Sequence, residues 1–252
     1  MIELRDITLA FGSRVLMADA TATFRRGELV ALLGRNGTGK STLLRAISAL
    51  GAVQRGDILV DGSPIGSMSP RELARSIAFV NTERVDVEAL TAYDLVAIGR
   101  APYTDWMGRL GAEDRDIVER SLRLAGVEAL ACRTVDTLSD GECQRVMIAR
   151  ALAQQTDAIL LDEPTSFLDL PNRYELCTLL RDLAHRENKC VLFSTHELDI
   201  ALSLADSIAL VDTPRLEHLT TAEMITSGHI ERLFDSDHVK FDAATRAITL
   251  RR

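Results

Sequence analysis

Gly34-Arg-Asn-Gly-Thr-Gly-Lys-Ser41 is the stretch of sequence that decides the fold. It matches the pattern G-x-x-x-x-G-K-[ST], follows the apolar run Glu28-Leu-Val-Ala-Leu-Leu33 and precedes Thr42-Leu-Leu-Arg-Ala-Ile47. A buried strand, a glycine-rich loop and a helix in this order are the context that a phosphate-binding loop requires. An incidental glycine-rich turn with a lysine would not need these flanks. The stretch therefore predicts that the phosphates of ATP bind here.

The residues of this loop have separate predicted roles. Glycines allow backbone N–H groups to point at phosphate oxygens, and the helix N-terminus adds the positive end of its dipole. Lys40 is expected to reach the outer phosphates and Ser41 a magnesium ion. The predicted ATP-binding residues of the stretch are Gly34, Arg35, Asn36, Gly37, Thr38, Gly39, Lys40, Ser41 and Thr42.

Two carboxylates follow a second apolar run, Ala158-Ile-Leu-Leu161. Charges at the end of a buried strand are costly unless they meet a cation or polar partners. Asp162 is suited to bind Mg²⁺, and Glu163 is suited to polarise an attacking water, which makes it the predicted catalytic residue. The alternative is that both acids only cap the segment before Pro164.

The short motif Leu138-Ser-Asp-Gly-Glu142 precedes a helical segment. Ser139 and Glu142 are spaced as a capping box, so helix capping alone could explain them. The motif is also similar to the LSGGQ signature of the ATP-binding subunits of ATP-binding cassette (ABC) transporters, and it stands in the expected order. The chain therefore resembles this family over nearly its whole length.

Three more positions carry the resemblance. The run Ser166-Phe-Leu-Asp169 looks like the family's D-loop, so Asp169 is the predicted D-loop residue. His196, in Ser194-Thr-His196, matches the switch histidine, which implies contact with the γ-phosphate and a catalytic role beside Glu163. Phe11 matches the aromatic residue, usually Tyr, that stacks on adenine. The alternatives are a packed or helix-capping histidine and an ordinary core phenylalanine.

In this family two cassettes hold two ATP molecules between them. The resemblance implies that a second copy of this chain supplies the signature residues in trans, and that an isolated monomer is nearly inactive. The residues concerned are Ser139, Asp140, Gly141 and Glu142.

Two motifs depart from the family pattern. Thr82 stands where a glutamine usually follows the strand-like Ile77-Ala-Phe-Val80. Asp140 and Glu142 replace a glycine and a glutamine of the signature, and they add negative charge near the triphosphate of the partner copy.

Composition limits the classes of partner. The formal net charge of −8, from 29 Lys plus Arg against 37 Asp plus Glu, argues against a general nucleic-acid surface. The four cysteines form no C-x-x-C pair, which argues against a zinc site or a disulfide framework. No stretch approaches the roughly 18 to 20 apolar residues of a membrane span, and the start lacks the pattern of a signal peptide. We expect a cytoplasmic protein, peripheral on the inner face of the cell membrane.

The expected fold is a single α/β domain over residues 1–252. Alternation of apolar and polar residues over residues 2–32 predicts early strands, and later strands alternating with helices predict a parallel sheet. The resemblance implies a P-loop NTPase core of the ABC cassette type, with an antiparallel β subdomain and a helical subdomain inserted at about residues 83–157.

The region from Leu90 to Arg115 resembles the importer branch for iron-siderophore, haem and vitamin B12 complexes. This implies transmembrane permease subunits as partners and, indirectly, a substrate-binding protein. Tyr103, Trp106 and Met107 would then face the permease, although a small subdomain core is an equal alternative for them. An exporter cassette and a soluble cassette ATPase of the iron–sulfur assembly kind remain alternatives.

Overall fold

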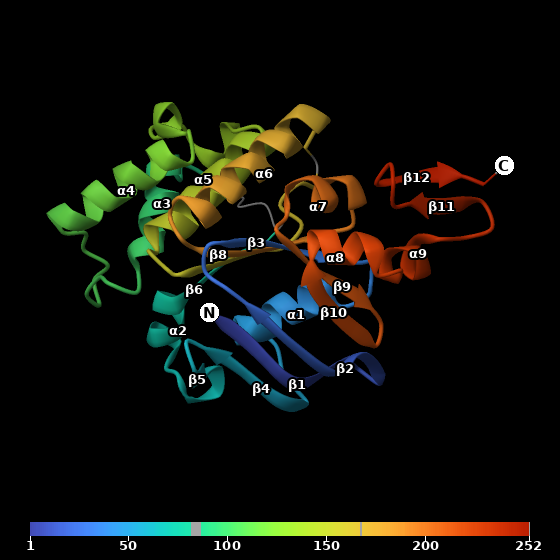
Figure 1. The fold of residues 1–252 in the computed structure, drawn as a ribbon. Helices are drawn as coiled ribbons and strands as arrows, with labels where there is room; N and C mark the ends of the chain where they lie inside the picture. The colour runs from blue at the N-terminus through green and yellow to red at the C-terminus, as the bar shows by residue number, and fades with distance from the viewer. Residues whose placement is uncertain (82–86, 167, 252) are drawn as a thin grey trace.

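The computed structural model describes residues 1–81, 87–166 and 168–251. Its centre is a six-stranded sheet in the order β10-β9-β3-β8-β7-β6 (Figure 1). All neighbouring strands are parallel except β10, which pairs antiparallel with β9. The strands are β3 Glu28–Leu33, β6 Ile77–Val80, β7 Ala158–Leu161, β8 Cys190–Thr195, β9 Ser207–Asp212 and β10 Arg215–Thr220.

Strand β3 is buried on both faces, and this explains why its sequence is continuously apolar. Leu29, Ala31 and Leu33 pack in one hydrophobic core, while Val30 and Leu32 pack in the core on the opposite face of the sheet. Successive side chains of a strand point to opposite faces, so a strand covered on both sides needs apolar residues throughout. The parallel sheet predicted from the sequence is confirmed.

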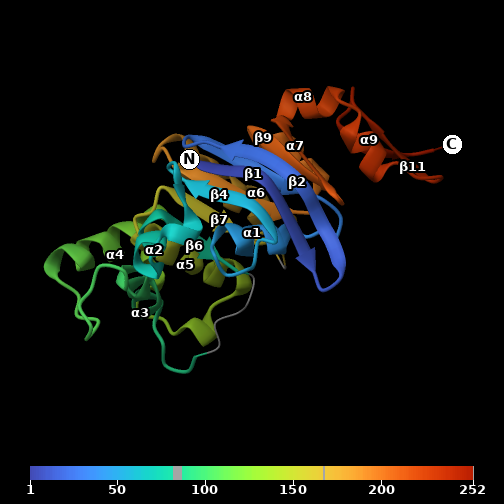
Figure 2. The same cartoon turned by 90° about the horizontal axis from the view of Figure 1, so that it is seen from below.

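A second, antiparallel sheet covers one face of the first (Figure 2). Its order is β2-β1-β4-β5. The helix α1, Lys40–Ile47, contributes Leu43 and Leu44 to the core that residues of both sheets share. The strands of this sheet are β1 Ile2–Phe11, β2 Arg14–Phe24, β4 Arg55–Val60 and β5 Ser63–Pro64. The predicted early β part and the helix just past Gly39 are both confirmed.

Helices dominate the described chain between β6 and β7. They share the other core of the central sheet, to which Leu95, Val118 and Val146 belong. The elements are α3 Ala92–Ala97, η2 Ile98–Arg100, α4 Ala112–Leu124, η3 Glu128–Leu130, η4 Val135–Thr137 and α5 Asp140–Ala153. The boundary of an inserted subdomain at about residues 83–157 stays a prediction, because residues 82–86 lie outside the described part and α5 packs in the core of the sheet.

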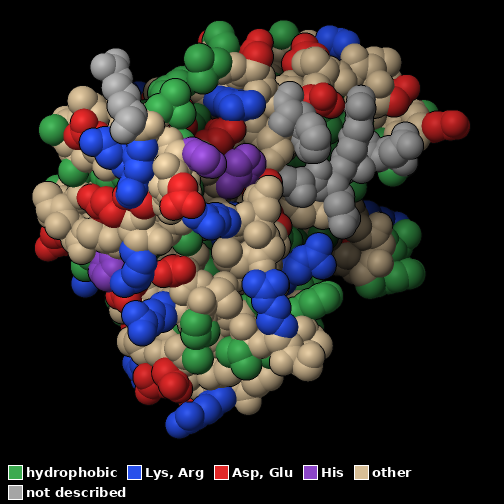
Figure 3. All heavy atoms as spheres, turned by 90° about the vertical axis from the view of Figure 1, so that its right-hand side faces the viewer, with side chains coloured by type: hydrophobic (Ala, Val, Ile, Leu, Met, Phe, Trp, Pro, Cys, Tyr) green, Lys and Arg blue, Asp and Glu red, His purple; other side chains and the backbone are tan. Residues whose placement is uncertain are grey.

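The remaining elements lie beside the sheets or after β10, and the C-terminal hairpin projects at one edge (Figure 1). They are η1 Ile65–Ser67, α2 Pro70–Ser76, α6 Leu170–His185, α7 Leu198–Leu204, α8 Thr221–Thr226, α9 His229–Phe234, β11 Val239–Asp242 and β12 Ala247–Leu250. No helix in the described ranges is long and apolar enough to cross a membrane. All four cysteines are free thiols, and only Cys132 is exposed. Acidic and basic side chains lie intermixed over the face drawn in Figure 3.

Candidate active site

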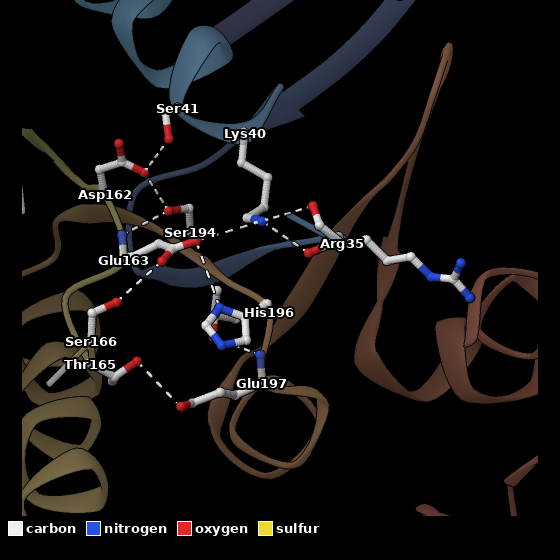
Figure 4. Close-up of polar contacts among 12 residues, drawn as sticks. Arg35, Lys40, Ser41, Asp162, Glu163, Thr165, Ser166, Ser194, His196 and Glu197 are labelled. Atoms are coloured by element: carbon white, nitrogen blue, oxygen red, sulfur yellow. Dashed lines mark hydrogen bonds and ion pairs between the residues drawn. The ribbon is translucent and has the colours of Figure 1, made fainter. Parts of the chain in front are cut away.

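The predicted catalytic residues meet at one edge of the central sheet. The phosphate loop follows β3, Asp162 and Glu163 follow β7, and His196 follows β8. Strand β8 lies between β3 and β7, and the three strands are parallel, so their carboxyl ends open at the same edge. Ligands of open α/β sheets bind at such an edge. Figure 4 shows side chains from these three segments turned toward one another.

Lys40 is held inside the phosphate loop. It is 4% exposed, and its Nζ donates hydrogen bonds to the carbonyl oxygens of Gly34, at 2.9 Å, and Arg35, at 3.2 Å. The Arg35 side chain itself points away from Lys40 (Figure 4). Burial lowers the pKa of Lys40, and attraction to the Glu163 and Asp162 carboxylates opposes that shift. The loop therefore places a desolvated cation at the end of β3.

Two glycines of the loop are sterically required. A Cβ at Gly34 would lie 2.9 Å from both Thr38 Oγ1 and Val211 O. Gly39 has a φ of +104°, a conformation that side chains rarely adopt, and a Cβ there would press on Leu16. Thr38 also donates to the Arg35 carbonyl at 2.9 Å, which tightens the turn. The tight path of this loop therefore explains the glycines.

A pair of oxygen atoms fits a magnesium ion. Ser41 Oγ donates a hydrogen bond to Asp162 Oδ1 at 2.9 Å, so a hydroxyl and a carboxylate face each other. Such hard oxygen atoms are the ligands that Mg²⁺ takes in phosphate sites. Ser194 Oγ donates to the same Asp162 oxygen at 2.7 Å and accepts from the backbone N–H of Glu163 at 2.8 Å. Ser194 therefore fixes both acidic residues.

Glu163 lies between the loop and His196. Its Oε1 is 3.7 Å from Lys40 Nζ and 3.7 Å from His196 Nδ1, and its Oε2 accepts a hydrogen bond from Ser166 Oγ at 3.2 Å. The Glu163 side chain is 28% exposed and that of His196 46%, so water reaches both. A carboxylate that water reaches beside a cation is placed to polarise a nucleophilic water. The capping alternative does not account for these contacts.

A cavity of about 420 Å³ joins the loop to the turn between β1 and β2. Lys40, Ser41 and Glu163 line one end. Phe11 lines the other, and it is 77% exposed, so it is not a core residue. The described residues that line it are Phe11, Arg14, Leu16, Asn36, Gly37, Gly39, Lys40, Ser41, Thr42 and Glu163. Stacking of Phe11 on adenine stays a prediction.

The signature residues line a different cavity, of about 360 Å³, together with Asp169. None of its lining residues belongs to the first cavity. The lining is Ser139, Asp140, Gly141, Glu142, Arg145, Leu168, Asp169 and Asn172. The structure therefore brings Asp169 and the signature together, but it does not bring them to the phosphate loop of the same chain.

The capping box in the signature is confirmed. Ser139 Oγ accepts from the Glu142 N–H at 3.3 Å, and Glu142 Oε2 accepts from the Ser139 N–H at 2.8 Å. The Glu142 carboxylate accepts from the Ser139 N–H and also from Ser139 Oγ, at 2.9 Å, and these two hydrogen bonds lower the pKa of Glu142. Arg133 lies 3.4 Å from its other carboxylate oxygen. Asp169 likewise accepts from the N–H of Asn172 and caps α6. Capping does not exclude a second role in trans, which stays a prediction.

Sequence reasoning missed part of the site. The sequence points to Ser194 only as a neighbour of His196, although a polar residue at the carboxyl end of a buried strand is itself a usable signal. Glu197 was missed as well, and it accepts hydrogen bonds from Thr165, at 3.4 Å, and Arg173, at 2.5 Å. The contact with Thr165 ties the segment after β8 to the segment after Glu163 (Figure 4), and the contact with Arg173 ties it to α6. Thr82 lies outside the described residues.

The chain is similar to many ATP-binding proteins of transporters. Residues 17–166 match the family model described as ABC transporter. An uncharacterized ABC transporter ATP-binding protein of Methanocaldococcus jannaschii is 40% identical, over 84% of this chain and 73% of that protein. The Bacillus subtilis protein YusV, described as a probable siderophore transport system ATP-binding protein, is 35% identical, over 92% and 85% respectively.

Solved structures give the same likeness. An inward-facing conformation of a protein described as a metal-chelate type ABC transporter matches with a TM-score of 0.82 and 29% identity, over 92% of this chain and 88% of that one. A dimeric ATP-binding cassette in a post-hydrolysis state, bound to ADP and Pi, matches with a TM-score of 0.74 and 26% identity, over 88% and 99%. The site geometry and these likenesses agree, and the chain belongs to the ABC transporter family as an ATP-binding cassette ATPase.

Proposed function

We propose that the chain energises a membrane importer for metal chelates of the iron-siderophore, haem or cobalamin type. It works as a homodimer on the cytoplasmic side of two permease subunits, which receive the chelate from a substrate-binding protein. The likenesses to a siderophore transport protein and to a metal-chelate type transporter support this substrate class. The observation that carries the ATPase role is the meeting of Lys40, Ser41 and Glu163 in one cavity, with Asp162 hydrogen-bonded to Ser41 at its edge.

The two separate cavities support a dimer. The signature cavity holds no residue of the phosphate end, so a nucleotide at Lys40 needs a second copy to meet Ser139 and Gly141. The likeness to a dimeric cassette bound to ADP and Pi agrees with this arrangement. Each dimer would then contain two sites, each built from both chains.

Each residue of the site has a distinct task in hydrolysis. Ser41 and Asp162 would hold Mg²⁺, which when bound offsets the negative charge of the phosphates. Lys40 binds the outer phosphate oxygens, and Glu163 accepts a proton from the attacking water. His196 contacts the same phosphate and keeps the Glu163 carboxylate turned toward it, since the two side chains lie 3.7 Å apart.

A complementation experiment tests the shared site. Lys40→Ala removes the phosphate contact, and Gly141→Asp places a carboxylate in the signature, where a new Cβ would meet only Leu168 at an ordinary 3.5 Å. Each variant alone should hydrolyse almost no ATP. When the two are mixed, heterodimers have one intact site, so part of the wild-type rate should return.

The control is a chain that carries both substitutions, mixed with the Lys40→Ala variant. No pairing of these two chains joins an intact phosphate loop to an intact signature, so no activity should return. Activity of the Gly141→Asp variant alone would contradict the role of the signature, and mixtures that stay inactive would contradict the shared site.

The three residues predicted to face the permease differ in how exposed their side chains are. Trp106 is 92% exposed and Met107 51%, so both are available to a partner. Tyr103 is not, because its ring lies against the Arg75 and Arg100 guanidiniums, at 4.9 and 4.0 Å, and its hydroxyl donates to Gln154 O. We therefore assign Trp106 and Met107, and not Tyr103, to permease contact.

Purification from the native membrane tests the importer role. The chain should co-purify with a transmembrane permease, and proteoliposomes of that complex should take up radioactive iron chelates only with ATP on the side of the cassette. A Glu163→Gln complex is the control and should take up none. Efflux in place of uptake would favour the exporter alternative, and a chain without membrane partners would favour the soluble cassette ATPase.

A further inference from the structure

The turn between β1 and β2 presents two side chains to the nucleotide cavity. Phe11 and Arg14 stand directly opposite each other in the strand register, joined by Gly12 and Ser13. Residues paired in this way have Cβ atoms about 4.5–5.5 Å apart on the same face of the sheet. Both residues line the cavity. The phenyl ring and the guanidinium therefore form one surface at the end remote from Glu163.

Arg14 has no partner within the described residues. No carboxylate of residues 1–81, 87–166 or 168–251 lies within 4.0 Å of its guanidinium, and no hydrogen bond engages it there. Other arginines of the same sheet are paired, since Arg5 lies 2.6 Å from Glu3 and Arg55 lies 3.4 Å from Asp19. An arginine carries five N–H donors in a planar fork. At Arg14 these donors remain available to a ligand.

The side chains of the β1–β2 hairpin offer adenine no hydrogen bond that is specific to it. The side chains that β1 and β2 contribute to the cavity are those of Phe11, Arg14 and Leu16, and none of them accepts a hydrogen bond. The exocyclic amino group of adenine is a donor, so these side chains leave it unpaired. Guanine presents two neighbouring acceptors, O6 and N7, which match the arginine fork. Among the described residues of the lining, the only carboxylate is that of Glu163, which lies beside Lys40 at the phosphate end.

We propose that Arg14 is a nucleobase-contacting residue, and that this site binds and hydrolyses GTP as well as ATP. Arg14 donates to O6 and N7 of guanine while the base stacks on Phe11. The inference rests on the proposed function, because it takes the turn as the base end of the site. It adds a residue and a second substrate that the family motifs do not supply.

Binding of both nucleotides to the purified full chain tests this inference. Wild type should bind GTP within about threefold of ATP. Arg14→Gln should weaken GTP binding about tenfold or more, as expected for loss of one bidentate contact, but ATP binding only slightly. Arg55→Gln, on the same sheet but outside the cavity, is the matched control and should change neither affinity. Hydrolysis of GTP by wild type should follow its binding, because Lys40 and Glu163 lie at the other end.

Phe11→Leu separates this inference from the proposed function. If Phe11→Leu weakens binding of both nucleotides while Arg14→Gln changes neither, the base end is correct and the inference about Arg14 is wrong. Rejection of GTP by wild type by more than about a hundredfold also overturns the inference, because one bidentate contact discriminates by no more than roughly that factor. If neither variant matters while Lys40→Ala still abolishes binding, the predicted base end itself is wrong.

Discussion

Ser194 Oγ lies 2.7 Å from Asp162 Oδ1, and it is the donor in this hydrogen bond. The same hydroxyl accepts the backbone N–H of Glu163 at 2.8 Å, and Ser194 is fully buried. One side chain of β8 thus fixes the carboxylate of one acidic residue and the backbone of the next. Because Asp162 also accepts from Ser41, the phosphate loop and β7 are connected through two serines.

Ser194→Ala should damage both stability and magnesium use. The change leaves the partly buried N–H of Glu163 without its partner, which costs about 1 kcal/mol in the free energy of unfolding, the lower end of the range for such groups. Asp162 also loses a donor that orients it, so half-maximal ATPase activity should need more Mg²⁺. Denaturant unfolding and a Mg²⁺ titration of the ATPase rate measure the two effects. Ser203→Ala, at an exposed position of α7, should change neither. An unaltered Mg²⁺ requirement would rule out the positioning role.

Glu163→Gln should separate binding from turnover. The amide keeps the shape of the side chain but accepts a proton poorly, so the ATPase rate should fall by about 10²–10⁴-fold. ATP affinity should change little, because Lys40 and the loop glycines still bind the phosphates. Steady-state hydrolysis and equilibrium nucleotide binding are measured on the same preparation. Glu175→Gln, whose side chain is 65% exposed on α6, is the control. A variant that turns over normally would show that another group activates the water.

The sequence predicts the site best where the site residues are contiguous in the chain. The loop from Gly34 to Ser41 and the pair Asp162–Glu163 are contiguous motifs at strand ends, and a parallel sheet brings such ends to one edge. The bond from Ser194 to Asp162 depends on β8 lying beside β7, and strand order is not written in any one segment. The separation of the signature cavity from the loop was expected only from the family resemblance.

Arg100 shows what periodicity does not predict. It is the last residue of η2, yet it is only 4% exposed. Its guanidinium donates to Asp114 Oδ1, Ala153 O and Gln155 Oε1, each at 2.8 Å. These partners come from two separate places in the chain, the start of α4 and the residues around the end of α5. A buried charge of this kind is satisfied only by tertiary structure, so its burial was not predictable from neighbours in sequence.

Arg100→Met should destabilise the helical part of the chain. The change leaves Asp114, whose side chain is 18% exposed, without its cation, and loss of one partner of a buried ion pair costs about 3–5 kcal/mol. Asp114 keeps some contact with water, so a loss of about 3 kcal/mol, the lower end of this range, is expected. Denaturant unfolding measures the loss. Arg120→Met, at a side chain that is 66% exposed on α4, should cost far less. Equal losses in the two variants would mean that the Arg100 network contributes nothing beyond a surface pair.

Lys40→Met should stabilise the nucleotide-free fold while it abolishes ATP binding. Burial lowers the pKa of Lys40 below its ordinary value of 10.5, so the folded chain releases the proton more readily than the unfolded chain. Below the folded pKa, the buried charge therefore reduces the free energy of unfolding. As the pH rises from the folded pKa toward 10.5, the unfolded state binds more protons, and wild type becomes more stable relative to the variant.

Denaturant unfolding of both proteins at pH 7 and at several values up to 10 measures this dependence. The advantage of Lys40→Met should be largest at pH 7 and should shrink as the pH rises. Lys240→Met is the control, because Lys240 is exposed and its substitution should give a difference that does not follow this trend. A Lys40→Met protein that is less stable at pH 7 would mean that the bonds from Nζ to the Gly34 and Arg35 carbonyls outweigh the cost of burying the charge. In that case the lysine would stabilise the empty loop as well as the bound nucleotide.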